Sequence, residues 1–222
     1  MTNFRRMFLF NLIALIILVG GGFVAYSFYN EGLNYLKTDN ARIEGQAISI
    51  SSPAAGKLVA WDGVIGKKYN AGETIGKVEV VSQSPTGEPV VRTLDITIPQ
   101  TGTIVTSSAV PNSYVAPGVP LAQAFDLDHL WVTANIKETD INDIQVGNLV
   151  DVYVDAYPGT TLSGKVDQIG LYTASTFSLL PSGNTSGNYT KVTQVIPVRI
   201  TLDGYKGLNL VPGLNVTVRV KK

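Results

Sequence analysis

A repeat with an offset of 46 residues is the feature that most constrains the fold of this chain. The stretches 55–75 and 101–121 carry glycines, prolines and apolar residues at matched positions. Five pairs make up the repeat: Pro53 and Pro99, Gly56 and Gly102, Val59 and Val105, Gly72 and Gly118, Ile75 and Leu121. A stacked solenoid needs about three copies or more. Two copies therefore predict one unit built from two halves.

Each copy contains short runs rich in valine, isoleucine and threonine, separated by glycine, proline and asparagine. Such runs are typical of small all-β units. Gly72 and Gly118 suit backbone positions with positive φ, where a side chain would clash. We expect halves at 47–81 and 96–126, joined by a short turn. Packed face to face, they would close a β-sandwich over four apolar residues: Val59, Ile75, Val105 and Leu121.

Residues 7–29 contain no charged residue, and Asn11 is their only strongly polar side chain. As a helix they would be about 35 Å long, against roughly 30 Å of bilayer hydrocarbon. Arg5 and Arg6 precede the run, so the positive-inside rule places residues 1–6 in the cytoplasm. A cleaved signal peptide is the competing interpretation, but its apolar core is normally about 7–15 residues long. We predict a single-pass membrane anchor, with the bulk of the chain outside the cytoplasm.

Charge and cysteine content exclude several classes of function. Lysine plus arginine (17) balances aspartate plus glutamate (17), so no net field attracts nucleic acid. The chain has no cysteine, which excludes disulfides, thiol catalysis and iron–sulfur ligation. We expect no nucleic-acid partner, and an exported region held together by its sheets.

The C-terminal region also reads as strands. "LWVTANI" (130–136) and "LVDVYVDA" (149–156) alternate between apolar and polar residues, which predicts strands buried on one face. "KETDINDIQVG" (137–147) between them predicts a single helical turn or two. The fold class is therefore mainly β. Its expected parts are residues 1–6, the anchor 7–29, a stalk and first strand at 30–45, a β unit at 46–126 and a second β domain at 127–222.

The repeated half resembles the biotinyl/lipoyl half-motif. In carrier domains of that fold, a lysine at the hairpin between the halves is acylated. Here the hairpin from Val81 to Asp95 has no lysine, and the nearest, Lys77, lies back in the strand. The resemblance therefore implies a lipoyl-like β-sandwich without carrier chemistry.

The order of segments resembles the membrane fusion proteins, or periplasmic adaptors, of multidrug-efflux and hemolysin-type secretion systems. "TDNARIEGQAISISSPAAGKLV" (38–59) is similar to the first strand of that family, and 130–170 is similar to its β-barrel domain. Residues 177–200 and 210–220 resemble the EmrA-type branch, which serves major-facilitator drug pumps. The resemblance implies a β-barrel adaptor domain at 127–222 and homo-oligomers. It also implies a partner transporter in the membrane, of the major-facilitator type or, as the alternative, an ABC exporter.

One departure from the family pattern concerns the connection between the halves. Members from double-membrane bacteria usually insert a long α-helical hairpin there, which reaches an outer-membrane channel. Residues 81–95 are too few for coiled-coil arms of several heptads. The sequence therefore predicts a short form without that hairpin, no contact with an outer-membrane channel, and a bacterial host with a single membrane.

No catalytic, cofactor or metal residues are predicted. His129 lies beside Asp126 and Asp128, but one imidazole with loop carboxylates is a weak metal signal, and a solvated turn is the preferred interpretation. Lys67 and Lys68 lack the spacing of a phosphate-binding loop. The apolar loop residues Phe177, Leu179 and Leu180 fit packing under the barrel and contact with a partner equally well.

The sequence thus predicts a non-catalytic, membrane-anchored extracytoplasmic adaptor that docks on a transporter and helps form the exit path of its substrate. Two alternatives remain from other classes. One is a surface-anchored binding module without a transporter partner. The other is an exported enzyme that uses a serine–lysine dyad or His129 as a base.

Overall fold

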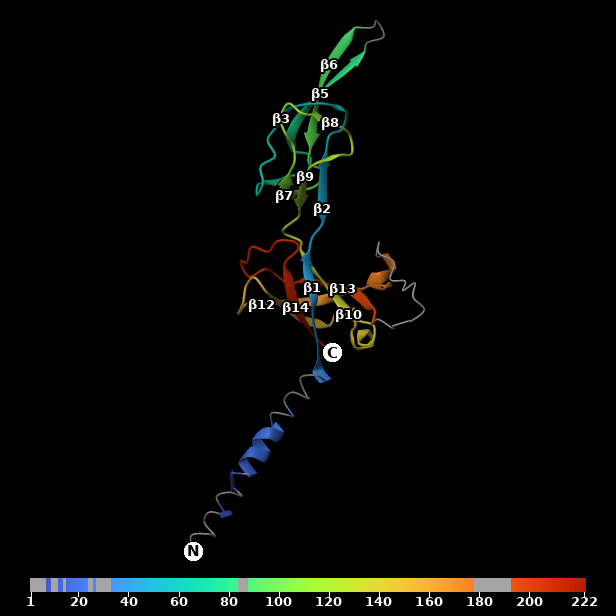
Figure 1. Ribbon diagram of the computed structural model, residues 1–222. Helices are drawn as coiled ribbons and strands as arrows, with labels where there is room; N and C mark the ends of the chain where they lie inside the picture. Colours follow the sequence, from blue (N-terminus) through green and yellow to red (C-terminus); the bar gives the residue numbers. More distant parts are fainter. Residues whose placement is uncertain are drawn as a thin grey trace, which may run out of the picture. The chain divides into compact units, whose positions relative to one another are not determined.

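The computed structural model describes residues 7–8, 12–13, 15–23, 26, 33–83, 88–177 and 193–222. From residue 35 onward the regular secondary structure of the described chain is β-strand apart from two 3₁₀ turns, which confirms the predicted mainly β class (Figure 1). The chain divides into two compact units: the second is formed by residues 43–131 and 209–213, and the first by the remainder. Among the described residues, no helix combines the length and apolar character needed to cross a membrane. The anchor predicted at 7–29 lies partly outside the described residues.

The first unit is a closed six-stranded barrel, as expected for the C-terminal region. Its strands run around the barrel in the order β1 (Tyr35–Glu44), β10 (Trp131–Lys137), β13 (Val195–Leu202), β12 (Thr161–Ile169), β11 (Leu149–Val154) and β14 (Asn215–Lys221). Two 3₁₀ turns, η1 (Ile141–Asp143) and η2 (Ala174–Phe177), lie between strands. Alternate residues of β11 and β14 fill the interior: Val150, Val152, Val154, Val216, Val218 and Val220.

β1 belongs to the barrel, although the sandwich strands separate it from the other barrel strands along the chain. The sequence placed residues 30–45 in a stalk and first strand, ahead of the sandwich. In the structure β1 pairs along β14, and Leu36 and Ala41 are buried in the barrel. A register shift between Thr38 and Ala41 lets one strand present apolar side chains to the interior on both sides of a polar stretch.

The second unit consists of two four-stranded sheets that share one core. One sheet has the order β2 (Ala47–Ser51), β9 (Pro120–Phe125), β7 (Gly102–Ser107), β4 (Lys68–Tyr69). The other has the order β6 (Pro89–Thr97), β5 (Thr74–Gln83), β3 (Gly56–Trp61), β8 (Tyr114–Val115). Each sheet takes its two central strands from one half of the repeat and its outer strands from the other. The halves are therefore interleaved, beyond the simple face-to-face packing expected from the sequence.

Hydrogen bonds between the halves follow the 46-residue offset. The Leu58 amide donates to the Ser113 carbonyl (2.9 Å), and the Ile104 amide donates to the Lys67 carbonyl (3.2 Å). In the return direction, the Asn112 amide donates to the Leu58 carbonyl (2.7 Å) and the Gly66 amide to the Ile104 carbonyl (2.8 Å). Each short strand, β4 or β8, is thus held by the opposite half. Gly66 and Asn112 both have positive φ, a sixth matched pair.

Of the four repeat residues predicted to fill the core, two are buried, one is half-buried and one is exposed. Ile75 and Leu121 are buried, whereas Val59 is 40% exposed and Val105 is half-buried. Register shifts at Leu58/Ala60 and Ile104/Thr106 make Val59 and Val105 the extra residues of two matched β-bulges. Their neighbours Leu58 and Ile104 fill the core in their place.

Gly56 and Gly102 permit close approach of neighbouring strands. A Cβ atom on Gly56 would lie 2.3 Å from the Glu79 carbonyl oxygen, which belongs to the backbone of β5. A Cβ atom on Gly102 would meet the Ile48 Cδ1 atom at 2.8 Å and the Phe125 carbonyl oxygen at 3.1 Å. The first contact requires a strand to move, whereas the second is relieved largely by rotation of a side-chain end.

We predict that Gly56→Ala destabilises the sandwich by about 1–3 kcal/mol, the usual cost of overpacking a tight site. Gly102→Ala, the matched position of the second half, should cost less because the Ile48 side chain can turn away. Urea unfolding of the full-length protein in mild detergent measures both. An equal cost for the two variants would contradict the assigned difference between backbone and side-chain contacts.

Candidate functional site

The β5–β6 hairpin extends beyond the rest of the sandwich (Figure 1). Its ladder is continuous from Thr74↔Thr97 to Gln83↔Pro89, apart from one register shift near Gly76. Val81 lies opposite Val91, and these two side chains are 63% and 57% exposed. These two exposed valines form a small apolar surface on the hairpin and are not part of the sandwich core.

The connection between the halves leaves no space for helical arms. Because Gln83 pairs with Pro89, only residues 84–88 separate the two strands. Lys77, the lysine nearest the hairpin tip, lies opposite Asp95 in the middle of the ladder. The short hairpin predicted from the sequence is therefore present, and its tip offers no lysine for acylation.

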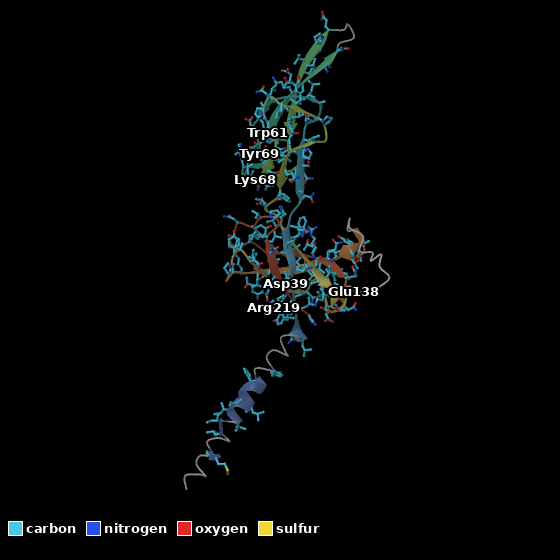
Figure 2. All side chains as sticks on the ribbon, viewed as in Figure 1. Asp39, Trp61, Lys68, Tyr69, Glu138 and Arg219 are labelled. Carbon is cyan, nitrogen blue, oxygen red and sulfur yellow. The ribbon has the colours of Figure 1, made fainter. Side chains whose placement is uncertain are left out.

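The turn at 126–129 is a small polar network. His129 Nδ1 lies 2.6 Å from Asp126 Oδ2, and the Asp128 amide donates to Asp126 Oδ1 (3.0 Å). The Asp128 carboxylate accepts a hydrogen bond from the Lys68 ammonium, labelled in Figure 2. The His129 side chain is 83% exposed. The network ties the turn to β4, and no group of three potential metal ligands occurs within the described residues.

Two pKa shifts follow from this network. The hydrogen bond from Lys68 to Asp128, together with the charge of Asp128, raises the pKa of Lys68. Burial alone would raise the pKa of Asp126, but the hydrogen bonds from His129 and the Asp128 amide and the charges of His129 and Lys68 hold it below its ordinary value. Both lysines at 67 and 68 thus have structural contacts, since Lys67 Nζ lies 4.6 Å from the centre of the Tyr69 ring.

A lowered pKa for Asp126 predicts a specific dependence of stability on pH. The ionised carboxylate stabilises the folded state above its unfolded pKa, and this contribution is lost as the pH falls through the lower folded pKa. The wild-type protein should therefore exceed Asp126→Asn in stability by a constant amount above about pH 3.8, and the difference should shrink below it.

Urea midpoints measured from about pH 2.5 to about pH 6 test this expectation. Asp62→Asn, at an exposed aspartate of the same unit, is the control. A difference between wild type and Asp126→Asn that stays constant down to the lowest pH would contradict it.

A hollow of about 200 Å³ lies over β7 and β9 in the sandwich. Its lining is Thr106, Ser107, Ser108, Pro120, Ala122 and Gln123. The Ser107 hydroxyl accepts a hydrogen bond from Trp61 Nε1 (3.1 Å), and the Ser108 hydroxyl donates to the Pro120 carbonyl (3.2 Å). The lining contains neither lysine nor histidine, so the two serines lack an adjacent base.

A second hollow, of about 290 Å³, lies on the outer face of the barrel and is lined by Lys37, Tyr153, Thr217 and Arg219. No motif in the sequence marks these four residues as a site. Alternation in β11 and β14 predicts that Tyr153, Thr217 and Arg219 face outward, but nothing in it brings them beside Lys37.

The loop residues Leu179 and Leu180 lie outside the described residues, so the choice between packing and partner contact stays a prediction.

Comparison with known proteins places this architecture in a family. Residues 130–220 match the model of the YknX-like beta-barrel domain. The chain is 44% identical over 220 residues to YhbJ of Bacillus subtilis, a proposed efflux system component, covering 99% of this chain and 95% of YhbJ. The chain belongs to the membrane fusion protein, or periplasmic adaptor, family. This confirms the resemblance seen in the sequence.

Some relatives are longer than this chain. The multidrug export protein EmrA of Escherichia coli is 39% identical over 106 residues, which cover 47% of this chain and 27% of EmrA. The structure of the periplasmic adaptor protein EmrA shares the fold, with a TM-score of 0.53 at 10% identity over 85% of this chain and 99% of that chain. The sequence match to E. coli EmrA covers about a quarter of the length of EmrA, whereas the match to YhbJ covers nearly all of YhbJ. Membership of the family makes the protein a non-catalytic adaptor.

Proposed function

We propose that this protein is a membrane-anchored, extracytoplasmic adaptor of a multidrug efflux or export system. It docks on an integral-membrane transporter and helps form the path by which substrate leaves. The similarity to YhbJ over almost the whole chain is the observation that carries the proposal. A match confined to the barrel would leave the sandwich and the N-terminal segment without a role.

Residues 7–29 anchor the protein in the cell membrane of a single-membrane bacterium, with residues 1–6 in the cytoplasm. The composition of this segment supports the proposal, because 23 uncharged residues are long enough to cross the hydrocarbon layer. The partner is a major-facilitator transporter in preference to an ABC exporter, since the matched EmrA is a multidrug export protein and the sequence resembles the EmrA-type branch. The adaptor forms homo-oligomers and makes no contact with an outer-membrane channel.

The absence of cysteine from the chain allows a direct test of the topology. We expect a single cysteine at Ser82→Cys, in the exposed part of the hairpin, to react with a membrane-impermeant maleimide in intact cells. A single cysteine at Thr2→Cys should react only after the cells are permeabilised. Equal labelling of both in intact cells would contradict a cytoplasmic N-terminus.

Affinity purification of the full-length protein from membranes of its own host tests the partner. We expect mass spectrometry to find a polytopic transporter in near-equal amount, because an adaptor acts in a stoichiometric complex. A tagged single-pass protein of unrelated sequence is the control. Recovery of cell-wall material without a membrane partner would favour the surface-anchored binding module in its place.

A further inference from the structure

The outer face of the barrel carries a row of charged residues across three neighbouring strands. Lys37 of β1 lies directly opposite Arg219 of β14, which in turn lies opposite Asp151 of β11. One step along the same strands, Thr217 lies opposite Tyr153. These positions alternate with the buried valines, so their side chains point away from the barrel interior.

Arg219 is held in position by its neighbours. Its guanidinium donates a hydrogen bond to the Asp151 carboxylate (3.2 Å), and it stacks over the Tyr35 ring at 4.3 Å from the ring centre. Figure 2 labels Arg219 on the barrel. Lys37, in contrast, is exposed. The pair therefore combines one fixed cation with one that can reach toward a ligand.

The hollow of about 290 Å³ is lined by four side chains, each of which can donate a hydrogen bond: Lys37, Tyr153, Thr217 and Arg219. No carboxylate belongs to this lining, although the Asp151 carboxylate accepts a hydrogen bond from the Arg219 guanidinium. Two cations and two hydroxyls around one hollow match the needs of a phosphate or carboxylate group.

The hollow lies near the end of the barrel at which the chain enters from the N-terminal segment. Tyr35 pairs with Lys221, and the Lys222 amide donates to the Asn34 carbonyl (3.0 Å), so both ends of the barrel sequence meet there. Lys37 follows residue 29 by eight residues, which span at most about 28 Å even when fully extended.

Charged residues of both signs lie around this end of the barrel. Lys221 adds to the two cations of the hollow, while Lys222 is paired with Asp143 (2.7 Å). Asp39 follows Lys37 by two residues and is exposed. Arg219 is paired with Asp151 (3.2 Å), and Lys37 is the exposed cation of the hollow.

We propose that this hollow binds the headgroup of an anionic phospholipid in the membrane that holds the anchor. The proposal rests on the proposed anchor, which keeps Lys37 within reach of the lipid surface. The headgroup phosphate lies between Lys37 and Arg219, and the hydroxyls of Tyr153 and Thr217 donate to it. Such a contact fixes the barrel against the membrane at one orientation.

Native mass spectrometry of the full-length protein in mild detergent tests the site. The protein is offered an equimolar mixture of phosphatidylglycerol and phosphatidylcholine, and the bound lipids are counted. We expect phosphatidylglycerol to be preferred, and Lys37→Gln to reduce the preference about fivefold, the effect of one basic residue at an anionic lipid surface. Lys165→Gln, at an exposed lysine of β12 on the same barrel, should leave the preference unchanged.

Other outcomes overturn the proposal. Equal retention of the two lipids, or equal losses in the Lys37 and Lys165 variants, removes the site. If the preference disappears only when Arg5 and Arg6 are both replaced by glutamine, the headgroup is bound at the N-terminus. Displacement of the lipid by inorganic phosphate or by an acidic peptide at equal concentration assigns the hollow to that ligand. Failure of the anchor itself is detected separately, by the cysteine-labelling pattern.

Discussion

The exchange of β4 and β8 between the halves of the sandwich is the constraint on which that unit depends. Each of these strands has two residues, too few to be stable alone, and each pairs with the opposite half. Four backbone hydrogen bonds, in two pairs related by the 46-residue offset, close the exchange. Because each half completes the other's sheet, the halves must fold together. The repeat in the sequence therefore follows from this pairing. Both halves must place a short strand at the same number of residues from the strand that it leaves, so that each can pair with the other half.

Most of this unit could be predicted from the sequence because its signals are local. Gly72 and Gly118 indicate turns with positive φ, and both have it. The matched pair Gly66 and Asn112 cannot be found by comparing residue types, because the two residues differ. Both have positive φ, since asparagine also tolerates this conformation. The error at Val59 has a different origin. A β-bulge inserts one residue, which reverses the side of every following side chain, and strict alternation cannot reveal where that happens.

The barrel was predicted as a barrel only through the family resemblance, because strand order is not local information. Alternation identifies which residues of β11 and β14 face inward, and the buried valines agree with it. It does not show that β1 and β14, from opposite parts of the chain, pair along their length. The hollow of Lys37, Tyr153, Thr217 and Arg219 depends on that pairing. Sites assembled across a barrel seam are therefore the ones that sequence reasoning misses most readily.

The β5–β6 hairpin can accept connections of different length without a change in the sandwich. The β5–β6 ladder extends from Thr74 to Gln83 and from Pro89 to Thr97, so the two strands are held together along their length before the connection begins. The entropy cost of a longer connection rises only slowly with its length. A helical hairpin inserted between residues 83 and 89 would thus leave the pairing of both sheets intact. The same sandwich can therefore carry a long insert or the short connection present in this chain.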